Sequence, residues 1–325
     1  MNISIIIPVK NEENCIGDLL DSLSEQSVKP DEIIMVDGGS VDNTVRIINH
    51  YKANGMPIHL IQLSEALPGK GRNIGIEAAR NDIIAMTDGG MIVDRRWLEC
   101  LVAPFERDSA IEVVYGVCDC YAKTLFEKCF VIVYVAANKK STSPHTYFPT
   151  LQSFALKKYI WEKAGRMPEH LRATEDLIFL NAIEKLRVKS NIAYDAIAHW
   201  RPRSSLRETF ILAKKYAECD ALSSFHILRH IRKWFIYLSG LCFFCMGFIY
   251  PGWFAVLLLG FTANTLLVCS KNWDNFINLL RSSPIRVFIT ISLVITALDI
   301  GGMIGFARGV FKKFTIFFTA LEDKA

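Results

Sequence analysis

The amino-acid sequence predicts a doubly wound α/β domain with a mostly parallel sheet, followed by an α-helical membrane region. Two observations carry this prediction. Strand and helix patterns alternate along the first part of the chain, which indicates helices on both faces of a parallel sheet. The last part is instead dominated by Phe, Leu, Ile, Val and Gly. The 325 residues are enough for one large domain or two ordinary ones.

The α/β part opens with the β-branched run 3–9, which is typical of a strand buried in a parallel sheet. Residues 12–26 follow with apolar side chains at helical spacing. The further predicted strands are 32–37, 58–63, 82–87 and 190–198, and the further predicted helices are 42–51, 72–80 and a segment that starts near Asp176. Because ligands bind at the carboxyl ends of strands in such sheets, the loops after the strands are candidate binding sites.

Three polar loops follow predicted strands: Lys10-Asn11-Glu12, Asp37-Gly38-Gly39-Ser40 and Asp88-Gly89-Gly90. Their coincidence favours a ligand site, although Asp37 alone could simply cap its own turn. A dinucleotide-binding site is disfavoured because the first loop contains no glycine, and the chain has no P-loop.

Composition gives weaker indications. The net charge of +4 does not mark the whole chain as a nucleic-acid binder, so we expect no nucleic-acid partner. The nine cysteines form no paired metal-type clusters, and reduced cysteines suit a cytosolic domain. The apolar run 3–9 is too short for a signal peptide, so we expect the N-terminus to stay in the cytosol.

Six segments occur in a fixed order between residue 3 and about residue 210: SIIIPVKNEE, EIIMVDGGSVDNT, GKGRNIGIEAAR, MTDGGMIVDRRWLE, ATEDLIFLNAIEK and HWRPRSSL. Together they resemble glycosyltransferase family 2, the inverting enzymes with the GT-A fold. The resemblance implies a GT-A fold, Rossmann-like with a mostly parallel sheet. It also implies a glycosyltransferase that uses a nucleotide-diphosphate sugar as donor.

By position, the resemblance implies that Pro8, Glu12 and Asp37 line the nucleoside pocket. It further implies that Asp88 binds a divalent cation, Mg²⁺ or Mn²⁺, on the sugar diphosphate, and that Asp176 is the catalytic base. The chemistry agrees, because a diphosphate leaving group needs positive charge and the incoming hydroxyl needs a base.

Two of these positions have alternatives. Asp176 begins a predicted amphipathic helix, where an acid can act merely as a cap or dipole partner, and Glu175 is expected to support it. Gly90 stands where the family commonly has a second acid. One carboxylate can still hold Mg²⁺ together with substrate phosphates and waters, and Asp94 or His199 could compensate.

Basic side chains are candidates for the diphosphate: Lys70, Arg72, Arg201 and Arg203. An arginine can hold phosphate through two parallel hydrogen bonds. For Lys70 and Arg72, a solvated loop is an equal alternative. His199 is a candidate for the metal or the diphosphate, and a purely structural role is equally open.

The predicted parts are a GT-A domain at 1–204, an amphipathic basic juxtamembrane helix at 205–234, a membrane region of two to three helices at 235–318 and a polar tail at 319–325. The charge-free runs 235–250 and 253–270 are marginal for spans, which need about 20 residues. A third run begins at Val287, and a buried helical core is the alternative. We expect membrane lipids as partners and a plasma-membrane location with the catalytic domain in the cytoplasm.

The sequence therefore predicts a membrane-bound inverting glycosyltransferase that moves a sugar from a nucleotide-diphosphate sugar to a lipid-linked or glycan acceptor. The chain lacks the Gln-x-x-Arg-Trp pattern of processive synthases and has only HWRPR near its place, which favours single-sugar transfer. The alternative is a non-catalytic membrane protein that retains a nucleotide-binding GT-A domain, and Gly90 is its best support.

Overall fold

The computed structural model describes residues 1–138, 150–224 and 226–322, and these residues form two compact units. The first unit is built from residues 1–121 and 150–201, and the second from residues 122–138 and 202–322. The predicted GT-A domain at 1–204 therefore differs from the first unit, because a helix in the middle of it belongs to the second unit.

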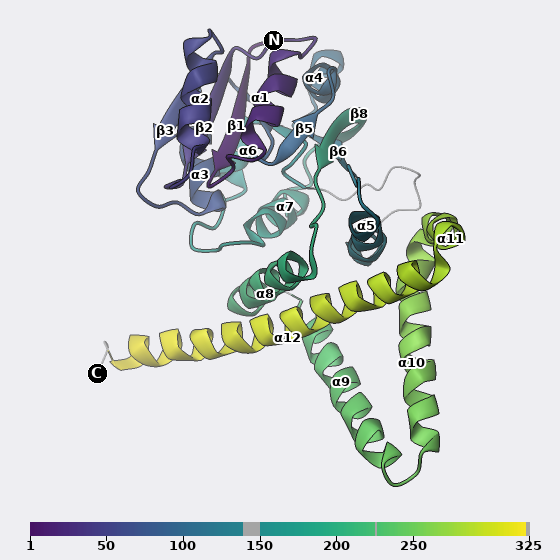
Figure 1. Cartoon of the computed structure of the whole chain (residues 1–325). Helices are drawn as coiled ribbons and strands as arrows, with labels where there is room; N and C mark the ends of the chain where they lie inside the picture. The colour runs from purple at the N-terminus through teal and green to yellow at the C-terminus, as the bar shows by residue number, and fades with distance from the viewer. Residues whose placement is uncertain (139–149, 225, 323–325) are drawn as a thin grey trace. The chain divides into compact units, whose positions relative to one another are not determined.

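The first unit contains an eight-stranded sheet with the order β3-β2-β1-β4-β7-β6-β8-β5 (Figure 1). The strands are β1 (Ile3–Val9), β2 (Glu32–Asp37), β3 (Ile58–Gln62), β4 (Ile83–Met86), β5 (Met91–Val93), β6 (Val113–Cys120), β7 (Phe154–Lys157) and β8 (Ser190–Trp200). The neighbours β3, β2, β1 and β4 are parallel, as are β6 and β8. Strand β7 runs antiparallel to β4 and β6, and β5 runs antiparallel to β8. The predicted mostly parallel α/β sheet is confirmed.

Hydrophobic clusters cover both faces of this sheet. The helices of the first unit are α1 (Ile16–Ser24), α2 (Thr44–Ala53), α3 (Pro68–Ala78), α4 (Trp97–Arg107), α6 (Lys158–Lys163) and α7 (Glu175–Lys185). Successive side chains of a strand point to opposite faces. Accordingly, Ile5 and Ile7 of β1 lie in a cluster with α1, α2 and α4, and Ile6 lies in the cluster with α3, α6 and α7.

The loops after β1 and β2 are hydrogen-bonded to each other. The backbone N–H of Asn11 donates to Ser40 Oγ at 2.8 Å, and that of Glu12 donates to Thr44 Oγ1 at 2.7 Å. Asn11 has a φ of 56°, a left-handed conformation that asparagine tolerates better than most residues. These contacts hold the two polar loops together at the carboxyl edge of the sheet.

The second unit is helical. It consists of α5 (Leu125–Asn138), α8 (Leu206–Ser223), α9 (Ile227–Gly247), α10 (Gly252–Cys269), α11 (Trp273–Ser282) and α12 (Pro284–Glu322), with a 3₁₀ turn at Ser270–Asn272. Helix α8 begins with an N-cap, in which Ser205 Oγ accepts from the Glu208 N–H, and Glu208 accepts from the N–H of the preceding Ser204.

Glycines let α12 approach α8 closely. A Cβ added at Gly301, Gly305 or Gly309 would lie 2.6, 2.1 or 2.5 Å from a backbone carbonyl oxygen of α8. These glycines recur every four residues and therefore share one face of the helix. Two helical stretches of the described chain, Gly252–Ser282 and Pro284–Thr315, are long and apolar enough to cross a membrane.

Candidate active site

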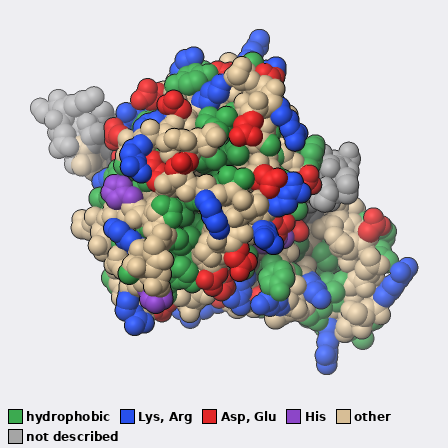
Figure 2. Space-filling view, turned by 90° about the horizontal axis from the view of Figure 1, so that it is seen from above, with side chains coloured by type: hydrophobic (Ala, Val, Ile, Leu, Met, Phe, Trp, Pro, Cys, Tyr) green, Lys and Arg blue, Asp and Glu red, His purple; other side chains and the backbone are tan. Residues whose placement is uncertain are grey.

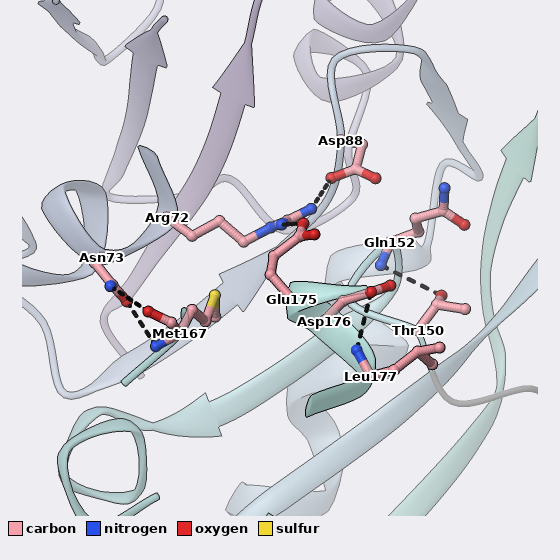
Figure 3. A network of polar contacts seen from close by, with 9 residues as sticks. All are labelled: Arg72, Asn73, Asp88, Thr150, Gln152, Met167, Glu175, Asp176 and Leu177. Carbon is pink, nitrogen blue, oxygen red and sulfur yellow. Dashed lines mark hydrogen bonds and ion pairs between the residues drawn. The ribbon is translucent and has the colours of Figure 1, made fainter. Parts of the chain in front are cut away.

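Three segments of the first unit bring four charged side chains together (Figure 3). Arg72 comes from α3, Asp88 from the loop after β4, and Glu175 and Asp176 from the first turn of α7. The segments are up to 103 residues apart in sequence, so the grouping depends on the fold.

Arg72 is the centre of this group. Its guanidinium donates to Asp88 Oδ1 at 2.5 Å and to Glu175 Oε1 at 2.8 Å, and its side chain is only 5% exposed. The two neighbouring acids keep its pKa above the usual value despite burial. Arg72 is therefore a buried, doubly ion-paired cation and not part of a solvated loop.

Buried polar atoms in this group are incompletely paired. Within the described residues, Arg72 Nε, Glu175 Oε2 and the neighbouring Thr87 hydroxyl are buried and have no hydrogen-bond partner. Such an atom typically costs about 1–3 kcal/mol of stability. Buried polar groups that lack a partner in this way are a candidate feature of a functional site.

Asp176 has the raised pKa of a candidate base. Burial, followed by the negative charge of Glu175, raises its pKa to about 6, and the charge of Arg72 acts in the opposite direction. One carboxylate oxygen accepts from the backbone N–H of Leu177 at 2.9 Å. A carboxylate with this pKa is a stronger base than an ordinary aspartate and is still mostly ionised at neutral pH.

The backbone just before these acids is strained. Thr174 is buried and has a φ of 73°, in the left-handed region that β-branched residues rarely adopt. Strain of this kind costs about 1–3 kcal/mol and is found mostly at functional sites.

A buried asparagine connects α3 to the segment before α7. The Asn73 side chain donates to the Met167 carbonyl at 2.9 Å and accepts from the Met167 N–H at 3.0 Å. The indole N–H of Trp161 also donates to Asn73 Oδ1, at 2.9 Å. Because Asn73 follows Arg72, these bonds help to place the guanidinium against Glu175. Sequence reasoning did not single out Asn73, although an asparagine on the buried face of a predicted helix is a usable signal.

The glycines after Asp88 differ in their surroundings. A Cβ at Gly89 would lie 3.1 Å from Val9 and 3.2 Å from Glu12, so a side chain would be crowded there. A Cβ at Gly90 would be 3.6 Å from Glu12 Oε2, an ordinary contact distance. Glu12, which is predicted to bind the nucleotide-sugar donor, therefore lies beside Gly90, the position where the family commonly has a second acid. Its carboxylate also accepts from the Cys15 thiol at 2.9 Å.

Other predicted nucleoside residues line the carboxyl edge. Asp37 is buried, and its carboxylate accepts from the Ser40 hydroxyl at 2.5 Å and from the N–H groups of Gly39 and Ser40. The turn-capping role is thus present. Pro8 is half-buried, and a Cβ at Gly71 of α3 would lie 3.3 Å from its Cβ. Lys70 is also half-buried.

The predicted metal residues are not gathered in one cluster. His199 Nε2 lies 2.7 Å from Asp94 Oδ1, so the two residues that could compensate for Gly90 pair with each other. Within the described residues, no group of three or more His, Cys, Asp or Glu side chains is placed to hold a metal ion. Arg201 is exposed in the first unit, and Arg203 is exposed in the second unit.

Gln152 is a further polar residue at this site (Figure 3). Its side-chain oxygen accepts from the Cys118 thiol at 3.2 Å. Burial raises the pKa of Cys118 well above its usual value, so the thiol remains a donor. Nothing in the local sequence indicated this position, because the segment that contains it has no recognisable pattern.

A mostly parallel sheet with a charged group at its carboxyl edge is the arrangement expected of a GT-A fold. The family model described as glycosyl transferase family 2 matches residues 4–160 of the chain.

Two curated relatives are 30% and 25% identical to this chain over the matched residues. An uncharacterized glycosyltransferase, EpsJ, of Bacillus subtilis strain 168 is 30% identical over 142 residues, which are 44% of this chain and 40% of the relative. The O-antigen chain rhamnosyltransferase RfbN of Salmonella typhimurium strain LT2 is 25% identical over 227 residues, which are 65% of this chain and 71% of the relative. The chain thus spans less than half of the first relative.

A solved structure supports the fold. The mannosyltransferase PcManGT of Pyrobaculum calidifontis, in complex with GDP-Man and Mn²⁺, has a TM-score of 0.54 at 18% identity. The comparison covers 93% of this chain and 87% of that one. It confirms the GT-A fold.

Proposed function

We propose that this protein is a membrane-bound inverting glycosyltransferase. It transfers a sugar from a nucleotide-diphosphate sugar to a hydroxyl group of a lipid-linked or glycan acceptor. The observation that carries the proposal is the grouping of Arg72, Asp88, Glu175 and Asp176, with the pKa of Asp176 raised to about 6. The intact group does not favour the non-catalytic alternative.

Asp176 is the proposed base. Its carboxylate removes the proton of the acceptor hydroxyl while the hydroxyl oxygen attacks the anomeric carbon opposite the leaving diphosphate. This direction of attack inverts the configuration at that carbon. General-base catalysis typically contributes about 10²- to 10⁴-fold to the rate. Glu175 supports the base indirectly, because its charge raises the Asp176 pKa and its carboxylate holds Arg72.

Asp88 and Arg72 are proposed to meet the diphosphate. Arg72 occupies one oxygen of Asp88, and the side chain of Asp88 is 30% exposed. The residues present therefore fit a cation that is held by one carboxylate and completed by phosphate oxygens, as Mg²⁺ often is. A bound Mg²⁺ or Mn²⁺ would neutralise charge on the departing diphosphate. The fold relative PcManGT was solved with GDP-Man and Mn²⁺.

The remaining donor contacts are proposals from position. Pro8, Glu12 and Asp37 stand at the carboxyl edge and would line the nucleoside pocket. The basic and imidazole candidates for the phosphates are Lys70, Arg201, Arg203 and His199. Asp37 already accepts from three donor groups, so we propose that it also orders the turn that contacts the nucleoside.

The second unit supports the membrane part of the proposal. Helices α9 and α10 and the turn between them expose large apolar side chains, including Phe235 at 73%, Phe248 at 73%, Leu258 at 68% and Leu267 at 71%. Such a surface indicates a partner other than water. We propose a plasma-membrane location with the catalytic unit in the cytoplasm and a lipid-linked acceptor.

Thermal unfolding in detergent tests the donor part of the proposal. UDP, GDP, dTDP and CMP are compared, each with and without Mn²⁺. A nucleotide at a hundred times its dissociation constant should stabilise the protein by about 2.7 kcal/mol. The matching radiolabelled sugar donor is then incubated with extracted membrane lipids to detect transfer. Stabilisation by none of the four nucleotides would contradict the proposal.

A further inference from the structure

Helix α12 packs one face against the rest of the second unit. Its buried side chains Val287, Ile291 and Val294 are fully covered, and its glycines continue the same face along α8. Both α5 and α8 contact this helix. A continuous buried face along one helix shows that α12 is built into the unit along much of its length.

The opposite face of α12 is apolar and exposed. Its exposed side chains are Ile285 at 74%, Ile289 at 52%, Leu293 at 47%, Ile300 at 41%, Ile304 at 45% and Phe311 at 73%. Arg286 is an exposed basic residue near the start of this helix. Arg308 and Lys312 are partly exposed in its second half, where both pair with Glu218 of α8. An apolar helix face flanked by Lys and Arg is typical of a helix that lies in the plane of a membrane surface, with its charged ends near anionic head groups.

The middle of α12 meets the charged start of α9. Asp299 pairs with Lys233, and it accepts from the Tyr237 hydroxyl at 3.1 Å. Arg229 and Arg232 lie within the same turns of α9. A charge at the bilayer centre costs at least about 2.5–3.5 kcal/mol. The midpoint of α12 is therefore placed at a charged boundary and not at the centre of a bilayer.

Helices α9 and α10 form a hairpin that leaves α12 and returns (Figure 1). Both helices contact α12, and α10, whose last residue Cys269 is buried, also contacts α5, which in turn contacts α12. The tip at 248–251 is apolar and exposed.

The tip also satisfies its own backbone. The N–H of Phe248 donates to the Cys245 carbonyl, and those of Ile249 and Tyr250 donate to the Met246 carbonyl. In lipid, backbone groups must be paired internally, because no water is present to bond them. The hairpin tip meets this requirement for these N–H groups.

We propose that α12 lies in the plane of the membrane surface and does not cross the bilayer. The part that enters the lipid is the α9–α10 hairpin, which goes in and comes back on the same side. The partner of the exposed face of α12 is a phospholipid bilayer with anionic head groups. This inference rests on the proposed membrane location and concerns how the second unit is seated there.

Cysteine labelling of the full chain in bacterial membranes tests this placement. The variants are Arg286→Cys and Lys312→Cys near the two ends of α12, and Tyr250→Cys at the hairpin tip. Asn54→Cys, in an exposed turn of the first unit, is the reference. A membrane-impermeant maleimide is applied to spheroplasts and to inside-out vesicles. Mass spectrometry of peptides then separates each new label from the native cysteines.

Cysteines at positions 286 and 312 are expected to react with the maleimide in the same preparation in which position 54 reacts. They are expected not to react in the other preparation. Position 250 is expected not to react from that side until detergent is added. Reaction of 286 and 312 from opposite sides of a membrane-embedded chain would overturn the in-plane placement alone. Labelling of position 250 without detergent, from the side on which position 54 is labelled, would also overturn the placement. Release of the chain by alkaline carbonate would instead contradict the proposed membrane location.

Discussion

The two units of this protein depart from ordinary globular design in opposite ways. The first unit buries charge, since Arg72 and Glu175 have side chains only 5% and 6% exposed. The second unit exposes apolar surface along α9, α10 and α12. Charged side chains of both signs are interspersed on the face shown in Figure 2, as on an ordinary water-soluble surface. Buried, perturbed charges are common at functional sites, and exposed apolar surface is common where a partner binds.

The largest expected effect is on the buried charge of the first unit. Asp176→Asn should lower kcat by about 10²- to 10⁴-fold, because the amide cannot accept the acceptor proton. Nucleotide binding, measured by thermal shift, should be retained. Glu184→Gln is the matched control, since Glu184 is exposed on the same helix and should leave kcat unchanged. Full activity of Asp176→Asn with a hydroxyl acceptor would remove the base assignment.

The next effect concerns the stability of the same group. Arg72→Met should destabilise the protein by about 3–5 kcal/mol, because Asp88 and Glu175 lose their shared cation. Urea unfolding followed by fluorescence measures this change. The double variant Arg72→Met/Glu175→Gln should lose less than the sum of the single losses, since one unpaired charge is removed as well. Strict additivity would show that the two residues are not coupled.

A smaller effect is expected from packing in the second unit. Gly305→Leu should destabilise the contact between α8 and α12 by about 1–3 kcal/mol, because a Cβ there would lie 2.1 Å from the Lys214 carbonyl oxygen. Gly302→Ala is the control, because a Cβ at Gly302 meets nothing within 4 Å. Thermal unfolding in detergent compares the two. Equal melting temperatures would mean that the helices are not in this close contact.

Local sequence predicted the parallel half of the sheet well. The β-branched side chains of the runs 3–9 and 32–37 predict buried strands, and β1 and β2 lie at those residues. The antiparallel place of β7 between β4 and β6 was not predictable, because strand pairing over such distances leaves no local pattern. The same holds for helix α5, which interrupts the predicted domain and belongs to the second unit.

The sequence predicted which residues belong to the candidate site, but it did not predict the contacts between them. The sequence pointed to Arg72, Asp88 and Asp176, but not to the ion pairs that join Arg72 to two acids. His199 illustrates the limit, because its pairing with Asp94 depends on β5 lying beside β8 at the edge of the sheet. The bonds of Asn73 likewise arise only when α3 meets the segment before α7.

The last expected effect is the pH dependence that follows from Asp176. Below its pKa of about 6, each further pH unit should reduce the ionised base, and hence kcat/KM, by about tenfold. Stability should change in the opposite sense. Because folding raises this pKa above its ordinary value, Asp176 favours the folded state at low pH, and this contribution is lost as pH rises through about 6.

Comparison with Asp176→Asn isolates the contribution of Asp176 to the pH dependence of stability. From about pH 4 to pH 7, the unfolding free energy of the native protein should fall relative to that of the variant. Urea unfolding at several pH values measures the difference, and activity assays of the native protein give the rising limb of kcat/KM. A difference that does not change with pH would mean that Asp176 has an ordinary pKa. The buried charges of the first unit would then have a structural role, and their contrast with the apolar surface of the second unit would not indicate catalysis.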